Sequence, residues 1–206
     1  MNNSYVDIAN NLLIFTVYAI VVSLVFNQAL KSLETKIVVK FDTDSVNEQL
    51  AEENLQDAIE VNFAFAPSYR VDELKNLKLS VKNKSPNEIV TIDWNQSYLI
   101  NFKNVAGRLI RVVDDMTDIP ASQSATTLYP GQGAEEQLSN EAILAPLFDP
   151  GQLKTAAQER GRFVVRLILK LKSMEDGTER SCRLRCPFVP SKLRWTRALT
   201  IALQPK

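Results

Sequence analysis

Apolar residues form one continuous run near the start of the chain, whereas later segments mix apolar with polar positions. Residues 12–26 read LLIFTVYAIVVSLVF and contain no charged side chain. Extended to Leu30, the run reaches about 28 Å as a helix, which matches the hydrocarbon core of a bilayer. We therefore predict a single transmembrane helix over residues 12–30, after a short tail of residues 1–11. The side chains expected to anchor it in lipid are Leu12, Leu13, Ile14, Phe15, Val17, Ile20, Val21, Val22, Leu24, Val25 and Phe26.

Two other interpretations of this run compete with the anchor. A cleaved secretory signal, which would make this an exported protein, needs a basic leader and a small-residue cleavage site. Residues 1–11 contain Asp7 and no Lys or Arg, and no such cleavage site follows the run. A buried core helix would show a continuous polar stripe, which Thr16, Tyr18 and Ser23 do not form. The membrane anchor is therefore favoured.

Lysines near the two ends of the run predict its orientation. Lys31, Lys36 and Lys40 follow the run, and nothing basic precedes it. Because positive flanks remain on the cytoplasmic side, the C-terminal domain is predicted to be cytoplasmic. We expect a single-pass protein of a bacterial inner or thylakoid membrane.

An acidic segment follows the anchor and is expected to form a stalk over residues 31–60. Residues 41–60 contain seven Asp or Glu and no Lys or Arg. Ser45 and Glu48 have the spacing of a capping box, which predicts a helix beginning at Ser45. Val46 and Leu50 begin a thin apolar stripe along it. Residues 33–42 fit either the tail of the preceding helix or a short strand, because periodicity does not separate the two.

From Val61 onward the apolar residues recur with a period of two, which is typical of half-buried strands. The clearest case is residues 162–172, followed by an Asp176-Gly177 turn and a second strand. In that second strand the alternation places Arg183 and Arg185 outward. The inward set is Cys182, Leu184, Cys186 and Phe188. Further strands are predicted at residues 61–66, 77–83, 89–94, 98–103 and 108–113.

The remaining segments are assigned from turn residues and local patterning. Residues 135–148 lie between two Pro-Gly turns and are expected to form a loop with a helical turn or two. At the C-terminus, Leu199, Ile201 and Leu203 alternate with polar or small residues. This pattern favours a closing strand over a helix lying on the membrane.

About seven short strands separated by turns predict a mainly β domain over residues 61–206. The expected architecture is an immunoglobulin-like antiparallel β-sandwich, with a partly open barrel as the alternative. The chain lacks the Cys-Trp-Cys pattern of antibody domains. Hydrophobic residues make up 45% of the chain and charged residues 23%, which is ordinary for a packed domain.

Residues 81–100 (VKNKSPNEIVTIDWNQSYLI) contain a local motif, approximately N-K-[ST]-x-x-x-I-x-I-D-W-x-x-S. The matching residues are Asn83, Lys84, Ser85, Ile89, Ile92, Asp93, Trp94 and Ser97. The motif resembles one in uncharacterised bacterial membrane-anchored and envelope β-sandwich proteins, with slightly irregular spacing before Ile92. The resemblance spans about a tenth of the chain and implies a hairpin with no known activity. We expect Trp94 in the core, Asp93 accepting hydrogen bonds from turn amides and Ser97 beginning the next strand.

Charge is balanced overall but segregated along the chain. The formal net charge is zero, yet the residues after Gly151 are strongly basic. The basic end could bind anionic lipid headgroups, and the acidic segment could bind a basic partner. The alternative without a functional role is that the two regions face each other or water. Arg194, Trp195 and Arg197 form a combination suited to the headgroup layer, so they are candidate lipid or partner contacts.

Several chemistries are excluded by composition. The chain has no histidine, which removes Ser-His-Asp and Cys-His sites and the usual zinc sites. Cys182 and Cys186 would lie about 13 Å apart in a strand, too far for a disulfide, and are expected to be core thiols. Phosphate-binding glycine loops are absent from the sequence, so we expect no enzyme activity, catalytic residue, cofactor or nucleic-acid partner.

The expected function is that of a membrane-anchored interaction or assembly module, or an accessory subunit of a membrane complex. Its expected partners are the lipid bilayer and a membrane protein. The alternative is an accessory protein that binds a cation or small ligand through Asp114, Asp115 and Asp118. These residues lack the alternating order of a calcium loop, so a solvated loop is favoured and no metal is expected.

Overall fold

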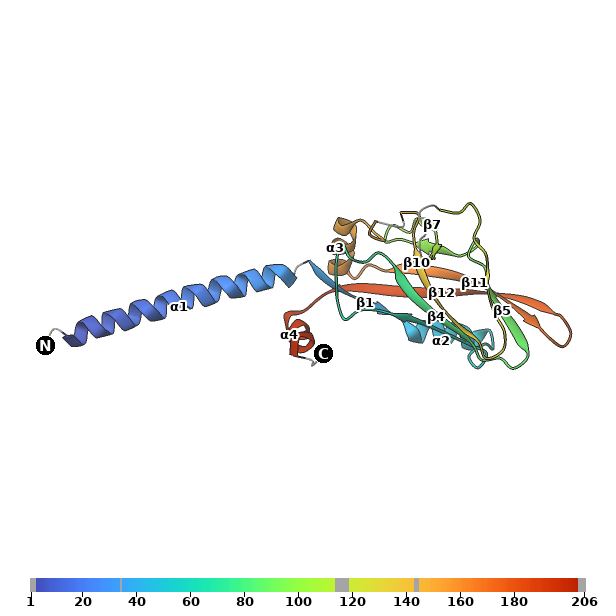
Figure 1. The fold of residues 1–206 in the computed structure, drawn as a ribbon, viewed down its shortest axis with the longest axis horizontal. Helices are drawn as coiled ribbons and strands as arrows, with labels where there is room; N and C mark the ends of the chain where they lie inside the picture. The colour runs from blue at the N-terminus through green and yellow to red at the C-terminus, as the bar shows by residue number, and fades with distance from the viewer. Residues whose placement is uncertain (1–2, 34, 114–118, 143–144, 204–206) are drawn as a thin grey trace. The chain divides into compact units, whose positions relative to one another are not determined.

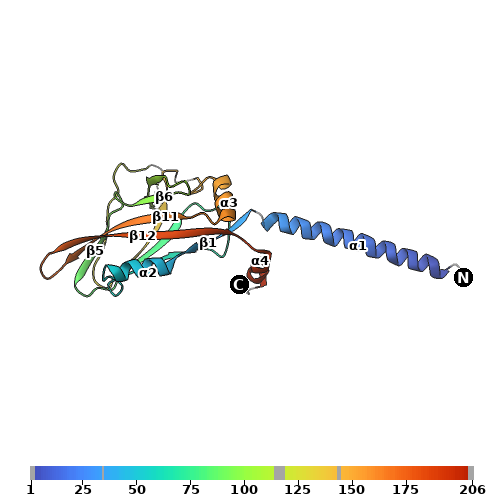
Figure 2. The same ribbon diagram turned by 180° about the vertical axis from the view of Figure 1, so that it is seen from behind.

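The structure is a computed structural model that describes residues 3–33, 35–113, 119–142 and 145–203 (Figures 1 and 2). It divides into two compact units. One comprises residues 1–36 and 193–206, and the other comprises residues 37–192. The helices are α1 (Asn3–Leu33), α2 (Thr43–Glu52), α3 (Pro150–Glu159) and α4 (Trp195–Leu203). Helices α2 and α3 belong to the larger unit, and α1 and α4 to the smaller.

Two antiparallel sheets make up the larger unit, so the prediction of a mainly β protein is confirmed. The eight-stranded sheet has the order β3 (Tyr69–Arg70), β1 (Lys36–Phe41), β12 (Glu179–Lys192), β11 (Phe163–Ser173), β5 (Glu88–Ile92), β9 (Thr126–Leu128). Strand β6 (Tyr98–Ile100) also pairs with β11, and β7 (Ala106–Arg108) pairs with β6. The four-stranded sheet has the order β2 (Ile59–Ala64), β4 (Leu77–Asn83), β10 (Gly133–Ser139), β8 (Ile110–Val112).

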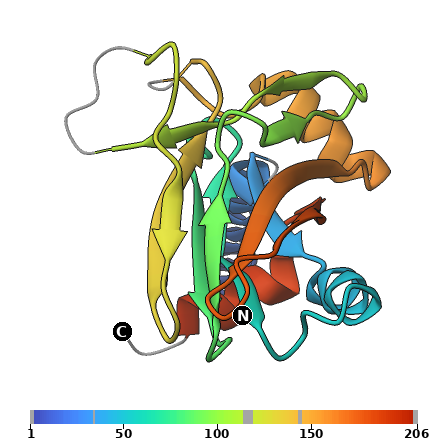
Figure 3. The same ribbon diagram turned by 90° about the vertical axis from the view of Figure 1, so that its right-hand side faces the viewer.

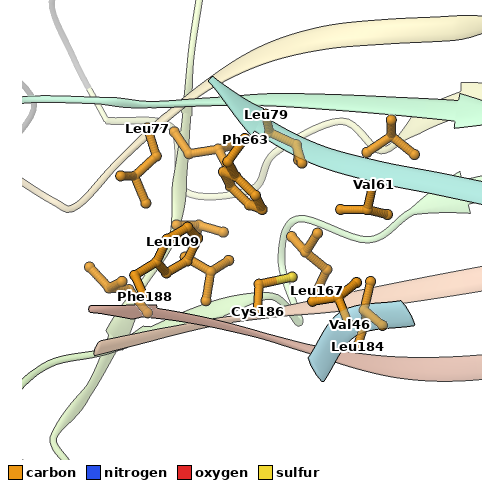
Figure 4. Packing of buried hydrophobic residues seen from close by; sticks show 14 of the residues in the cluster. Val46, Val61, Phe63, Leu77, Leu79, Leu109, Leu167, Leu184, Cys186 and Phe188 are labelled. Atoms are coloured by element: carbon orange, nitrogen blue, oxygen red, sulfur yellow. The ribbon is translucent and has the colours of Figure 1, made fainter. Parts of the chain in front are cut away.

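The apolar faces of the two sheets form one core. Figure 4 shows Phe63 and Leu79 of the smaller sheet pointing toward Leu167 and Phe188 of the larger one. Phe188 is central, because its ring lies 4.8 Å from that of Phe63 in an edge-on arrangement and 4.8 Å from that of Phe163 in a stacked one. Such aromatic pairs add to the stabilisation from burial alone.

The β11–β12 hairpin follows the alternation in the sequence. Cys182, Leu184, Cys186 and Phe188 are buried, and Arg183 and Arg185 are exposed, as predicted. The turn includes Gly177 at φ +71°, a conformation that favours glycine. Hydrogen bonds involving Ser173 and Thr178 lower the pKa of Asp176 in this turn to about 2.

Both cysteines are buried free thiols, as expected. Burial raises the pKa of Cys186 far above its ordinary value, and burial likewise raises that of Cys182. These thiols therefore remain protonated and unreactive at neutral pH.

The segment expected to form a stalk contains β1 and α2, and residues 37–60 belong to the larger unit. Strand β1 pairs with β12, which settles residues 36–41 as a strand. Figure 3 shows α2 (cyan) next to β1 (blue), at the side of the unit away from β10 (yellow). Val46 and Leu50 on the predicted apolar stripe are buried.

The predicted start of the acidic helix was wrong by three residues. Asp42 is the N-cap and accepts a hydrogen bond from Ser45 N at 3.2 Å. A carboxylate at this position satisfies a free amide and also interacts favourably with the positive helix end, so Asp42 displaces Ser45 from the capping role.

Gln49 of α2 protects the part of β12 that extends beyond its partner strand. Strand β1 ends at Phe41, opposite Phe188. The Gln49 side chain then donates to Arg185 O at 2.8 Å and accepts from Arg185 N at 2.9 Å. The Gln49 side-chain amide thus takes the place of a neighbouring strand at Arg185. It occupies backbone groups at the edge of β12 that could otherwise pair with another chain.

Three further expectations were wrong. Residues 135–139, predicted as the start of a loop, belong to strand β10, and their alternation was masked because inward-facing Glu136 is an acid. The single strand predicted over residues 108–113 is interrupted at buried Leu109, where the chain passes from β7 in one sheet to β8 in the other. The C-terminal segment is helix α4 instead of a closing strand. With no strand pairing among the described residues of this segment, a helix satisfies its backbone internally.

Candidate functional site

Helix α1 contains a stretch, Leu12–Ala29, that is long and apolar enough to cross a bilayer. None of this stretch is buried within the structure, and its large apolar side chains are exposed by 47% at Val22 to 67% at Phe15. Thr16 inside the stretch donates its hydroxyl to Leu12 O at 2.8 Å, which satisfies the hydroxyl within the helix. Length and composition of this kind also fit a signal sequence.

The start of α4 lies close in space to the end of α1. Leu193 N donates to Lys36 O at 3.1 Å, and both residues belong to the same unit as the two helices. Trp195 at the start of α4 is 60% exposed, and Arg194 and Arg197 are exposed beside it. The structure therefore brings the three predicted contact residues together, near the point where the chain leaves α1.

Asp93 has the role predicted from the motif. Its carboxylate accepts from Gln96 N at 3.2 Å and pairs with Lys170 Nζ at 2.9 Å. The hydrogen bond from Lys170 lowers the pKa of Asp93, and the same bond raises the pKa of Lys170. The pair therefore stabilises the fold at neutral pH, and this contribution is lost as pH falls through the lowered pKa of Asp93 or rises through the raised pKa of Lys170.

Trp94 and Ser97 also lie as the motif predicted. Trp94 is fully buried, and its Nε1 donates to Thr126 Oγ1 at 2.9 Å. Thr126 in turn donates to Glu136 at 2.7 Å, and Arg111 pairs with that carboxylate at 3.5 Å. This chain of polar contacts connects the two sheets. Ser97 directly precedes β6, donates to Asp93 O and accepts from Ile168 N.

Asn83 is a second polar connection between the sheets, a role that the motif did not predict. It is fully buried at the end of β4, in the smaller sheet. Its Nδ2 donates to Glu88 O at 2.8 Å and to Leu128 O at 3.0 Å, on two strands of the larger sheet. Its Oδ1 accepts from Ser85 N at 3.0 Å. The motif residues Asn83, Asp93 and Trp94 thus act in folding.

Two hollows on the larger unit could receive a small ligand by size. One of about 480 Å³ lies beside α3, between Phe102 and the helix residues Gln152 and Thr155. The other, of about 310 Å³, is lined by Gln96, Tyr98, Arg166, Ile168 and Arg183. Within the described part of the chain, no group of three His, Cys, Asp or Glu is placed to hold a metal ion. The proposed carboxylate loop, Asp114, Asp115 and Asp118, lies outside the described residues.

Comparison with known proteins identifies no relative. No family model matches the chain, and neither a curated protein nor a solved structure matches it. Functional inference therefore rests on the physical features of this chain alone.

Proposed function

We propose that the protein is a membrane-anchored, non-catalytic interaction module that serves as an accessory subunit of a membrane protein complex. The observation that carries the proposal is the exposed apolar surface of α1 over Leu12–Ala29, which buries nothing within the structure. Such a surface is costly in water and favourable in hydrocarbon. The two sheets would then act as an immunoglobulin-like scaffold beside the membrane.

The residues at the start of α4 support the same arrangement. The backbone hydrogen bond between Leu193 and Lys36 holds the start of α4 near the end of α1. A bilayer around α1 would therefore place Arg194, Trp195 and Arg197 close to its headgroup layer. Indole rings and basic side chains favour this layer. Lys31, Lys36 and Lys40 lie on the same side, so we propose that this side is cytoplasmic.

Trp195 provides a direct test of the lipid contact, because the only other tryptophan is buried in the core. Full-length protein reconstituted with brominated lipids is expected to lose a large share of its tryptophan emission relative to protein in ordinary lipids. The Trp195→Phe variant is expected to lose little, since Trp94 is fully buried and shielded. Equal quenching of the two proteins would contradict a headgroup location for Trp195.

The accessory-subunit proposal is tested by gentle detergent extraction followed by size measurement and mass spectrometry. A second membrane protein is expected in a fixed ratio with this chain. As a matched control, residues 12–30 are replaced by a leucine run of equal length, which preserves the membrane anchor. A partner retained in this control is held by the β domain, and a partner lost is held by α1. A chain that migrates alone after every mild extraction would contradict the proposal.

A further inference from the structure

Three arginines lie close together on the outer face of the larger sheet. Arg166 of β11 is directly opposite Arg185 of β12, and its neighbour Ile168 is opposite Arg183. Their side chains point away from the core, because the intervening residues Val165, Leu167 and Leu184 are buried. Like charges placed directly opposite each other in a sheet are destabilising.

These arginines have no carboxylate partners among the described residues. The ion pairs of the described chain include none made by Arg166, Arg183 or Arg185. Asp93, which follows the neighbouring strand β5, is already engaged by Lys170 and Gln96. The positive charge at this place is therefore not neutralised within the described chain.

The hollow of about 310 Å³ is lined by two of these arginines, Arg166 and Arg183, while Arg185 lies opposite Arg166. Arg166, Arg183, Tyr98 and Gln96 line it together with Ile168, which is 7% exposed. Among the described residues, no Asp or Glu lines it. Arg166 Nη1 donates to the Tyr98 hydroxyl at 3.0 Å, and its guanidinium carbon lies 5.7 Å from the centre of the Tyr98 ring. These two contacts hold the guanidinium in place before any ligand binds, which lowers the entropic cost of binding.

The unused donors of this group suit an oxyanion. Arg166 Nε is buried and has no acceptor in the described structure. Since Nη1 is engaged with Tyr98 and Nε is closed to solvent, the donors that Arg166 offers an oxyanion are those of Nη2, which makes no hydrogen bond in the described structure. Hydrogen bonds from a guanidinium to an oxyanion are charge-assisted and therefore strong. The Tyr98 oxygen accepts from Arg166, so its own hydrogen remains available to a ligand.

We propose that this hollow binds a phosphate monoester. A monoester carries a charge of about −1.5 to −2 and three acceptor oxygens at neutral pH. This matches two guanidinium groups and one phenol, whereas a carboxylate offers one charge and two oxygens. A bound dianion also offsets the repulsion between the opposed arginines. The ester is carried either by a soluble metabolite or by a lipid headgroup such as that of phosphatidate. The inference does not depend on the proposed anchor function.

The test measures binding of glycerol 3-phosphate to the full chain in neutral detergent by calorimetry. Saturable binding is expected for the wild type. Arg183→Gln, at an exposed position that leaves the core intact, is expected to weaken binding about tenfold or more, as expected for loss of a charged hydrogen-bonding group. Lys172→Gln is the matched control, because Lys172 is exposed on the same face of β11 but does not line the hollow. Its binding is expected to stay within about twofold of the wild type, since a distant exposed charge is largely screened.

A second variant separates the hollow from general electrostatic attraction. Tyr98→Phe keeps the ring and all charges but removes the hydroxyl, and is expected to weaken binding by about fivefold to tenfold. Binding to vesicles that contain phosphatidate, compared with vesicles of phosphatidylcholine alone, identifies whether the phosphate monoester comes from a lipid. Tighter binding to phosphatidate vesicles assigns a lipid headgroup, and tighter binding to the soluble ester assigns a metabolite. The proposal is overturned if neither glycerol 3-phosphate nor phosphatidate vesicles show saturable binding. It is also overturned if Arg183→Gln and Lys172→Gln weaken binding equally.

Discussion

Replacement of Asn83 by aspartate is expected to lower the free energy of unfolding by about 3 kcal/mol, because it removes the donors that connect the two sheets. Asn83 is fully buried, and its Nδ2 donates to carbonyl oxygens of Glu88 and Leu128. A carboxylate donates to neither, so both carbonyls lose their partner and face a buried negative charge. Urea unfolding of the full chain in neutral detergent, followed by tryptophan emission in the Trp195→Phe background so that only Trp94 emits, measures the change.

A matched substitution on the same sheet controls for the chemistry of the change. Asn62 of β2 is exposed, and its Oδ1 accepts only from the neighbouring Phe63 N, a bond that aspartate preserves. Asn62→Asp is expected to change the free energy of unfolding by less than about 0.5 kcal/mol. Equal effects at the two positions would show that Asn83 does not join the sheets.

The pH dependence of the Asn83→Asp variant gives a second signature. Burial beside two carbonyl oxygens raises the pKa of the new carboxyl, so the loss of stability is largest above that raised pKa. As pH falls through it, the protonated carboxyl regains one O–H donor and part of the lost stability returns. A loss of stability independent of pH would point to packing instead of hydrogen bonding.

Long, regular patterns predicted structure well in this chain. The alternation through Cys182, Leu184, Cys186 and Phe188 placed these side chains in the core, because one face of the middle part of β12 is buried. Trp94 was also placed correctly in the core, although it lies in the turn after β5, because a large apolar ring has few other stable positions.

Elements held by single polar contacts escaped prediction. Strand β10 presents Glu136 on its inner side, where Arg111 and Thr126 satisfy the carboxylate, so the sequence shows no clean alternation. Helix α2 was predicted, but its contact with β12 through Gln49 and the backbone of Arg185, across 136 positions of sequence, was not. Periodicity reports burial and does not report which distant group satisfies a polar side chain.

The arginine hollow illustrates the same limit for a binding site. The sequence shows Arg166, Arg183 and Arg185 on outward positions of two predicted strands. Only the register, which sets Arg166 opposite Arg185, and the position of Tyr98 on a third strand bring them to one place. Strand register is set by the turn and the buried face together, so the outward positions of two strands do not by themselves show which residues lie opposite each other.

Introducing two arginines at the centre of the apolar stretch is expected to release the protein from membranes. Val21 and Val22 are exposed mid-helix positions in Leu12–Ala29, and insertion of one arginine at the centre of a span costs about 3 kcal/mol. The Val21→Arg, Val22→Arg double variant therefore opposes insertion by about 6 kcal/mol, while arginine keeps a high helix propensity. Alkaline carbonate extraction is expected to leave the wild type in the membrane pellet and the variant in the supernatant.

The matched control and the mass of the mature chain distinguish an anchor from a cleaved signal. Val21→Leu, Val22→Leu keeps the stretch apolar and is expected to remain in the pellet, because leucine inserts at least as favourably as valine. An anchor also predicts that membrane-bound protein retains residues 12–30 and close to the full 23.2 kDa. A mature chain that begins after residue 30, or wild-type protein released by carbonate, would contradict the anchor. The exposed apolar surface of α1 would then belong to a segment that acts before the domain reaches its final location, and the start of α4 would lose its reason to lie at a headgroup layer.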